Sequence, residues 1–187
     1  MPRKIKINMK KIIVFAGSSS KTSINKQLVV YASTLLDNVE IEVLDLNNFD
    51  VPLYSIDLES EMGYPENAKK IVGLIKSSNG IILSLAEHNG AYTSVFKNLF
   101  DWMSRVEQKT FQGKPMLLMA TSPGTRGGLS VLEIAKDRFP RHDAQIVEVF
   151  SLPSFGANFS EGKISNNELN QELIKKVKTF NKVIHEN

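Results

Sequence analysis

Short hydrophobic runs and longer amphipathic segments alternate along this chain of 187 residues. Most of the runs are continuously apolar, which is typical of strands buried on both faces of a parallel sheet. One run instead alternates hydrophobic and charged residues, and it predicts a less buried strand near the sheet edge. The predicted strands are residues 11–16, 39–46 (the alternating run), 80–85, 116–121 and 145–150.

Between these runs, hydrophobic residues recur every three or four positions, which predicts helices. The predicted helices are residues 23–36, 66–77, 92–104, 128–138 and 166–184. Strands and helices that alternate with short connections are typical of a doubly wound α/β domain with three layers. We therefore expect residues 1–187 to form one domain, with residues 1–8 as a loose extension before an alternative start at Met9.

Two segments depart from this simple alternation. The stretch 47–65 contains Pro52, Gly63 and Pro65 and is irregular, and loops of this length are often lids or subunit contacts. The predicted helix 92–104 carries more hydrophobic residues than one packing face requires. Core packing accounts for part of this surplus, and we expect a subunit interface near the ligand site to cover the rest. The residues concerned are Val95, Phe96, Leu99, Phe100, Trp102 and Met103.

Polar residues gather where the first predicted strand gives way to the first predicted helix. They offer hydroxyls, one side-chain amide and the open backbone N–H groups of a helix's first turn. The positive end of the helix lies behind these donors, so the stretch fits an anion such as phosphate. Its sequence is Gly17-Ser18-Ser19-Ser20-Lys21-Thr22-Ser23-Ile24-Asn25.

Other known phosphate loops fit this stretch less well. Ser20 stands before Lys21 where a Walker loop has glycine, and Gly17 is a single glycine where a dinucleotide fingerprint has three. A hydroxyl-rich loop for a terminal monophosphate is one interpretation that remains. The other is a plain helix cap on a polar turn, because Ser, Thr and Asn are favoured in such turns.

Two further polar segments follow the third and fourth predicted strands. Ligands of doubly wound sheets bind beyond the carboxyl ends of the strands, so we expect these segments to meet the first loop. Their glycines let a flat ligand lie close to backbone N–H groups. A monophosphate at one end and a planar ring between the other two loops would together be FMN. The segments are Ala86-Glu87-His88-Asn89-Gly90-Ala91-Tyr92 and Ser122-Pro123-Gly124-Thr125-Arg126-Gly127-Gly128.

Composition and charge narrow the chemistry further. The net charge of +3 is small and most basic residues are scattered, so no nucleic-acid partner is required. The chain has no cysteine and three widely separated histidines, which excludes thiol chemistry and leaves no expected metal site. No hydrophobic run approaches the length of a membrane span, so we expect a cytoplasmic protein without a membrane partner.

Taken in order, these motifs resemble those of the NAD(P)H-dependent FMN reductases, a flavodoxin-like family that includes quinone, azo-dye and chromate reductases. The resemblance covers nearly the whole chain, and each motif follows the appropriate strand. The motifs are Gly17-Ser18 with Ser23 and Asn25; residues 86–91; Lys97-Asn98-x-x-Asp101-Trp102; Gly113-Lys114-Pro115; and Ser122-x-Gly124-x-x-Gly127-Gly128.

This resemblance implies a sheet of five parallel strands in the order 2-1-3-4-5, bound FMN, and dimers or tetramers. It also implies ping-pong hydride transfer from NADPH or NADH to flavin, quinone, azo or similar small acceptors. Because the flavin carries the chemistry, no catalytic side chain is expected. The implied cofactor-binding residues are Gly17, Ser18, Ser20, Lys21, Ser23, Ile24, Asn25, Ala86, Glu87, His88, Asn89, Gly90, Ser122, Gly124, Gly127 and Gly128.

Three residues depart from the family pattern. Ser20 stands where arginine is usual, and the neighbouring Lys21 is a mobile point charge rather than a planar fork, so FMN affinity is expected to be lower than usual. Ala86 replaces proline and loosens its loop. His88 replaces tyrosine, and it is either a contact for the planar ring or a solvent-exposed loop residue.

Several functional alternatives stay open at this point. Arg126 is either a contact for a nicotinamide-nucleotide phosphate or a solvated surface residue. A flavodoxin-like electron carrier would bind FMN without oxidising a nicotinamide, but such carriers are usually acidic, whereas this chain has a pI near 9.0. An interaction module with a vestigial phosphate loop is a third alternative, because Ser20 and Ala86 depart from the family pattern.

Overall fold

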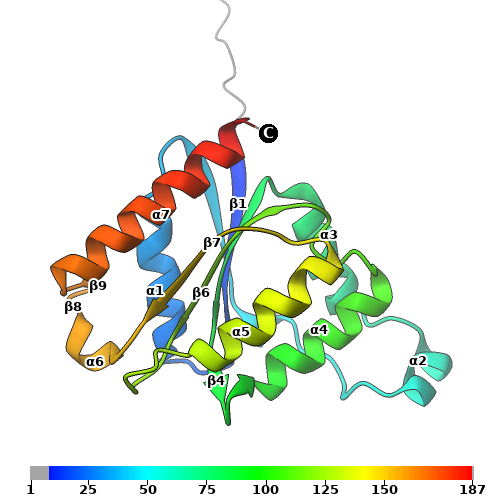
Figure 1. The fold of residues 1–187 in the computed structure, drawn as a ribbon. Helices are drawn as coiled ribbons and strands as arrows, with labels where there is room; N and C mark the ends of the chain where they lie inside the picture. Colours follow the sequence, from blue (N-terminus) through cyan, green and yellow to red (C-terminus); the bar gives the residue numbers. More distant parts are fainter. Residues whose placement is uncertain (1–8, 187) are drawn as a thin grey trace, which may run out of the picture.

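Five parallel strands form the central sheet of the computed structural model, which describes residues 9–186 (Figure 1). The expected loose extension, residues 1–8, lies outside this described part. The strands run in the order β2-β1-β3-β6-β7, which is 2-1-3-4-5 when only strands of this sheet are counted. The implied flavodoxin-like topology is therefore confirmed. The strands are β1 (Lys10–Gly17), β2 (Val39–Leu44), β3 (Gly80–Leu85), β6 (Pro115–Thr121) and β7 (Gln145–Leu152).

The burial of each strand follows its hydrophobic pattern. Every residue of β3 and β6, in the middle of the sheet, is buried. In β2, at the edge, only Leu44 is buried, in agreement with the alternating sequence of that segment. Parallel strands place their carboxyl ends at one edge of the sheet, so the loops after β1, β3 and β6 emerge side by side.

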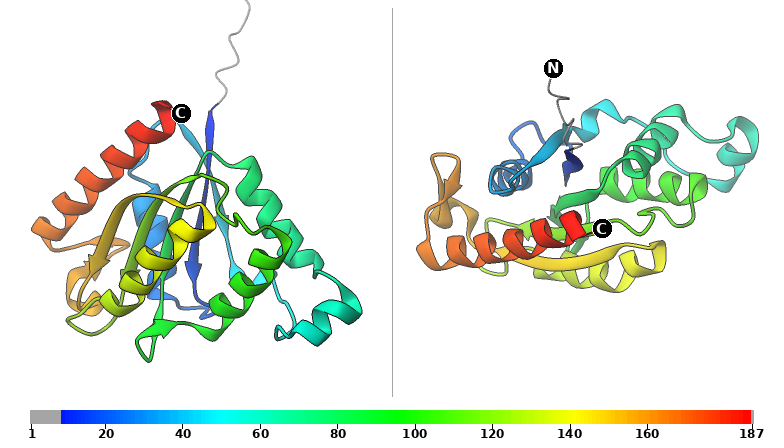
Figure 2. Two further views of the ribbon diagram at one scale, coloured as in Figure 1. Left: turned by 45° about the vertical axis from the view of Figure 1, so that its right-hand side comes forward. Right: turned by 90° about the horizontal axis from the view of Figure 1, so that it is seen from above.

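Helices cover both faces of the sheet (Figure 2). One face packs against α1 (Ile24–Ser33) and α7 (Asn167–Glu186), with Leu28, Val177 and Phe180 in its core. The other face packs against three helices and holds Ile71, Phe96 and Val131 in a second core. These helices are α3 (Glu66–Ser77), α4 (Ser94–Val106) and α5 (Leu129–Arg138). The expected three-layer architecture is thus confirmed.

A small hairpin precedes α4, so this helix begins two residues later than predicted. Strands β4 (Glu87–His88) and β5 (Ala91–Tyr92) pair in antiparallel fashion. Asn89 and Gly90 link them with φ values of 52° and 74°. An Asn-Gly pair with positive φ at both positions is the preferred two-residue hairpin turn, and it was a hairpin signal in the sequence. Thr93 then caps α4 by accepting a hydrogen bond from the N–H of Phe96.

The irregular stretch 47–65 contains more structure than predicted. A short 3-10 helix, η1 (Leu46–Asn48), opens it, and α2 (Ile56–Met62) lies within it with no buried residue. Most hydrophobic residues of α4 are buried in the chain, and Trp102 donates a hydrogen bond to the Pro52 carbonyl oxygen of this stretch. Five of the six residues of the apolar surplus in α4 are buried within the chain itself, so core packing accounts for them and the expected subunit interface does not. They are Phe96, Leu99, Phe100, Trp102 and Met103.

The carboxyl-terminal third adds short elements around β7. These are η2 (Phe139–His142), α6 (Phe155–Asn158) and the hairpin of β8 (Phe159–Ser160) with β9 (Lys163–Ile164). Over residues 9–186, no helix has both the length and the apolar character that crossing a membrane requires.

Candidate functional site

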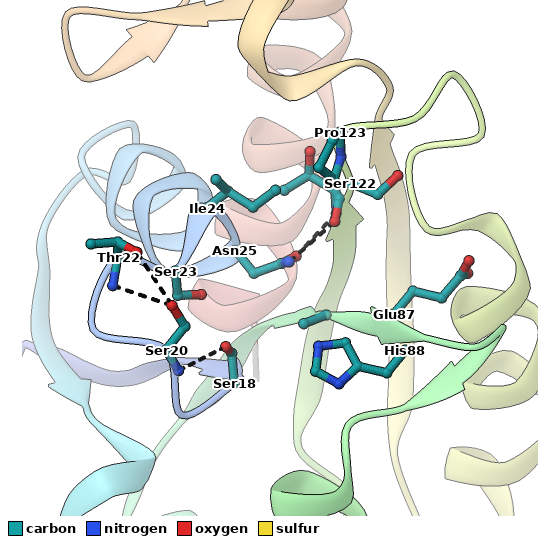
Figure 3. Close-up of a pocket in the computed structure, with 12 residues that line it drawn as sticks. Ser18, Ser20, Thr22, Ser23, Ile24, Asn25, Glu87, His88, Ser122 and Pro123 are labelled. Carbon is teal, nitrogen blue, oxygen red and sulfur yellow. Dashed lines mark hydrogen bonds between the residues drawn. The ribbon is translucent and has the colours of Figure 1, made fainter.

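A cavity of about 250 Å³ opens at the carboxyl edge of the sheet, where the loops after β1, β3 and β6 meet (Figure 3). Typical ligand pockets hold roughly 300–1,000 Å³, so this cavity suits one end of a larger ligand. All three predicted polar segments contribute to it. The lining residues are Ser18, Ser20, Thr22, Ser23, Ile24, Asn25, Ala86, Glu87, His88, Thr121, Ser122 and Pro123.

Hydroxyl groups shape the loop between β1 and α1. The Ser18 hydroxyl accepts from the N–H of Ser20 at 3.2 Å, and the Ser20 hydroxyl accepts from the N–H of Thr22 at 3.3 Å. Ser23 caps α1 by accepting from the N–H of Lys26 at 3.1 Å. A hydroxyl that accepts a bond keeps its own proton, so Ser18 still has a donor to offer a ligand, and the Ser20 hydroxyl has one when the Thr22 hydroxyl 3.4 Å away donates to it. The loop is therefore both a helix cap and a ring of donors.

The first turn of α1 adds backbone donors to this ring. Within the described residues, the N–H groups of Ile24 and Asn25 have no hydrogen-bond acceptor in the protein. They are the first two N–H groups of the helix and carry its positive partial charge. Such a terminus binds phosphate readily, so the donor set fits the phosphate end of FMN.

No lysine or arginine is among the residues that line the cavity. Lys21, which the sequence offered as a replacement for the missing arginine, is exposed and lies outside the lining. Lys26 is paired with Asp45 instead. The hydrogen bond from Lys26 is the main reason that the pKa of Asp45 lies below its ordinary value. An anion in this cavity would therefore be bound by neutral donors, which are backbone N–H groups and hydroxyls.

The side chain of Asn25 does not complete the anion shell as the sequence suggested. It is 1% exposed and is bonded within the protein to Thr121 and Ser84. Only its backbone N–H is free to meet a ligand. This is a correction to the role expected for the amide.

The β4–β5 hairpin brings Glu87 and His88 to the other side of the cavity. A carboxylate oxygen of Glu87 accepts from the N–H of Val131 at 2.9 Å. It thereby caps α5, whose N-cap residue, Gly128, has no side chain to do so. His88 is exposed, and its ring is turned toward the opening in Figure 3. The two alternatives for His88 are therefore compatible, since it borders the cavity and also meets solvent.

The fold requires glycine at two positions after β6. Gly127 and Gly128 have φ values of 56° and 79°, in the left-handed region that favours glycine. A Cβ atom on Gly127 would lie 2.4 Å from the hydroxyl of Ser151, and one on Gly128 would lie 2.8 Å from the Cβ of Ala120. Gly124 has space around it, because its nearest such neighbour is the Ser122 hydroxyl at 3.8 Å.

Several residues expected at the site lie outside the lining of the cavity. Arg126 is exposed and donates to the Ser130 hydroxyl at 3.3 Å. Gly17 packs closely, since an added Cβ would lie 3.0 Å from Leu85. The residues outside the lining are Gly17, Lys21, Asn89, Gly90, Gly124, Arg126, Gly127 and Gly128.

The implied cofactor-binding residues did not include three residues of the lining, namely Thr22, Thr121 and Pro123. Thr121 ends β6, and its hydroxyl donates to the carbonyl oxygen of Leu152 at 2.7 Å. A hydroxyl residue at the carboxyl end of a central strand was the signal available for Thr121. Pro123 directly follows the predicted Ser122, so its place was implied by that of its neighbour.

The sequence of this chain is similar to known reductases. Residues 10–158 match the family model described as NADPH-dependent FMN reductase. A quinone reductase of Escherichia coli (strain K12) is 30% identical over 118 residues, which are 63% of this chain and 62% of that protein. An NADPH azoreductase of Bacillus sp. (strain OY1-2) is 32% identical over 122 residues, 65% of this chain and 64% of that protein. The matches thus span less than two thirds of these relatives.

A solved structure shares the fold over almost the whole length of this chain. It is FerB, described as a flavoenzyme NAD(P)H:(acceptor) oxidoreductase from Paracoccus denitrificans. The TM-score is 0.75 at 24% sequence identity, and the match covers 95% of this chain and 98% of FerB. At this identity the similarity shows a common fold.

Proposed function

The chain belongs to the NADPH-dependent FMN reductase family, and on this premise we propose that it is an FMN-dependent NAD(P)H oxidoreductase. It takes a hydride from NADPH or NADH and passes it, through FMN, to flavin, quinone, azo or similar small acceptors. The quinone reductase and azoreductase among its relatives support this class of substrates.

The observation that carries the proposal is the donor set at the start of α1. The free N–H groups of Ile24 and Asn25 and the hydroxyls of Ser18 and Ser20 belong to residues that line one small cavity. They suit a terminal phosphate, and the cavity leaves the rest of a larger ligand outside it. A flavin mononucleotide has this shape, with a phosphate at one end and a planar ring at the other.

The other two loops frame the ring in this proposal. FMN, when bound, supplies the hydride acceptor, so the chain itself has to bind the flavin, orient it and shield it from water. Residues 86–90 form one side, and residues 122–128 form the other, with open space beside Gly124. We assign no proton transfer to Glu87, because its carboxylate is bonded to α5.

Donor and acceptor reach the ring by the same opening, which His88 borders. Binding at one opening permits one substrate at a time, and this supports ping-pong order. Arg126 stands outside the cavity on the exposed loop, where its guanidinium is able to meet a nucleotide phosphate.

The proposed protein is a cytoplasmic homodimer or homotetramer that requires neither nucleic acid nor membrane. The support for self-association is a set of exposed apolar side chains on and beside α2, which no element of the described chain covers: Leu53 (82% exposed), Ile56 (57%) and Met62 (51%). Light scattering of the double variant Leu53→Ser, Ile56→Ser tests this; the wild type should be larger than a monomer and the variant smaller than the wild type.

Steady-state oxidation of NADPH and of NADH, with FMN and a quinone added, tests the proposed activity. Sustained oxidation that depends on both the protein and FMN supports the enzyme. Binding of FMN without any nicotinamide oxidation would favour an electron carrier. A protein that FMN neither colours nor stabilises against heat would favour the interaction module.

A further inference from the structure

The side chain of Asn25 bonds to the backbone at the end of a central strand. Its Nδ2 donates to the carbonyl oxygen of Thr121 at 3.1 Å, and its Oδ1 accepts from the N–H of the same residue at 3.0 Å. The pairing of β3 with β6 ends at Leu85 and Ala120, one residue earlier. The Asn25 amide thus forms hydrogen bonds with the backbone N–H and C=O of Thr121, the residue of β6 that follows Ala120.

Ser84 completes this arrangement from the neighbouring strand. Its hydroxyl donates to Oδ1 of Asn25 at 2.6 Å. Asn25, Ser84 and Thr121 are 1%, 0% and 1% exposed, so water does not compete for these hydrogen bonds. The amide oxygen has two protein donors, and the amide nitrogen has one protein acceptor. A helix residue is in this way bonded to both β3 and β6.

These contacts fix the part of α1 that carries the open donors. The backbone N–H of Asn25 and that of Ile24 belong to the same helical turn as the bonded side chain. On the other side of the loop, the Thr93 hydroxyl donates to the carbonyl oxygen of Gly17 at 2.8 Å. The loop between Gly17 and Asn25 is therefore held at both ends. Its donors are preorganised before a ligand arrives, which lowers the entropy that binding costs.

We propose that Asn25 is a positioning residue for the phosphate of FMN, and that Ser84 and Thr121 support it. This inference rests on the proposed function and specifies it further. The Asn25 side chain does not touch the ligand; it holds two neutral backbone donors where a phosphate meets them. Because no lysine or arginine lines the cavity, the placement of these donors determines how strongly the chain prefers FMN over riboflavin, the same flavin without a phosphate.

Titration of flavin fluorescence with FMN and with riboflavin tests this inference, because the two ligands differ only in the phosphate. Asn25→Ala should weaken FMN binding at least tenfold and change riboflavin binding less than twofold. Ser84→Ala, which leaves both contacts of Asn25 with Thr121 in place, should show the same selectivity with a smaller loss. Ser78→Ala is the matched control, because Ser78 is another buried serine with one hydrogen bond, to the carbonyl oxygen of Ile75 at 2.9 Å. In Ser78→Ala the ratio of FMN affinity to riboflavin affinity should equal that of the wild type.

The outcomes separate this inference from the proposed function. If Asn25→Ala weakens the binding of FMN and riboflavin equally, or leaves the ratio of the two affinities unchanged, the positioning role is overturned and the reductase proposal stays intact. A wild type that binds neither flavin would overturn both. If Asn25→Ala fails to fold, the affinities of Ser84→Ala for FMN and riboflavin decide instead. An affinity ratio in Ser84→Ala equal to that in Ser78→Ala would overturn the positioning role of Asn25.

Discussion

Asn98 and Trp102, one turn apart on α4, both donate a hydrogen bond to the carbonyl oxygen of Pro52, at 3.0 and 2.8 Å. Asn98 also accepts from the N–H of Tyr54 at 2.9 Å, and the Tyr54 ring packs edge-on against the indole. Two residues of the Lys-Asn-x-x-Asp-Trp motif thus fasten the stretch before α2 to the face of α4. Their function in this chain is to hold that stretch in place.

Trp102→Phe should destabilise the protein by about 1–2 kcal/mol, since it removes one partly buried hydrogen bond and part of a fully buried ring. Urea unfolding gives this value. The substitution should also speed up amide hydrogen exchange in α2 more than in α7, relative to the wild type. The surface substitution Arg141→Gln is the control and should stay within about 0.5 kcal/mol of the wild type. An unchanged unfolding free energy for Trp102→Phe would show that the hydrogen bond to Pro52 contributes nothing.

The two glycines of the loop after β6 should respond differently to alanine. Gly127→Ala adds a Cβ atom 2.4 Å from the Ser151 hydroxyl at a φ of 56°, so it should cost more than about 1 kcal/mol of stability. Gly124→Ala enters open space and should cost less than about 0.5 kcal/mol. Its effect should appear in FMN affinity instead. Thermal unfolding of both variants measures the difference, and equal melting temperatures would contradict it.

The sheet order followed from the family resemblance. The strands, helices and three loops at the carboxyl edge could be predicted because hydrophobic periodicity and short motifs are local properties of the sequence. The roles of single residues could not. Asn25, Glu87 and Trp102 look like ligand or interface residues in the sequence, but each forms a hydrogen bond to a backbone group at least 44 positions away. Such partners are set by the tertiary fold, and no local pattern encodes them.

Low pH should loosen the α2 region. Glu59 accepts hydrogen bonds from Arg105 and from the Tyr54 hydroxyl, both at 2.9 Å, and the Arg105 bond is the main cause that lowers the pKa of Glu59. A lowered folded-state pKa contributes stability above the ordinary glutamate range, and this stability is lost as the pH falls through the folded value. Proteolysis of residues 55–62 should therefore accelerate in acid. In Glu59→Gln the cleavage rate should vary less with pH; the same acid response as the wild type would exclude Glu59 as its source.

Ser20→Arg should strengthen FMN binding roughly tenfold, because a charge-assisted bond to phosphate replaces the weaker bond of the Ser20 hydroxyl. Riboflavin affinity should not change. Lys21→Gln is the control and should change FMN affinity less than about twofold, since Lys21 lies outside the cavity. Fluorescence titration at two salt concentrations checks both variants. If Lys21→Gln lowers FMN affinity by as large a factor as Ser20→Arg raises it, the phosphate is not bound by neutral donors alone.

The central claim is that this chain binds FMN and exposes its ring to a two-electron donor. An anaerobic titration of the FMN-loaded protein with NADPH, and separately with NADH, tests it most directly through the visible absorption of the flavin. The account predicts that at least one nicotinamide bleaches the flavin stoichiometrically, and that a quinone added afterwards restores the colour. A chain that takes up no FMN, or a bound flavin that stays coloured with both nicotinamides, would contradict it.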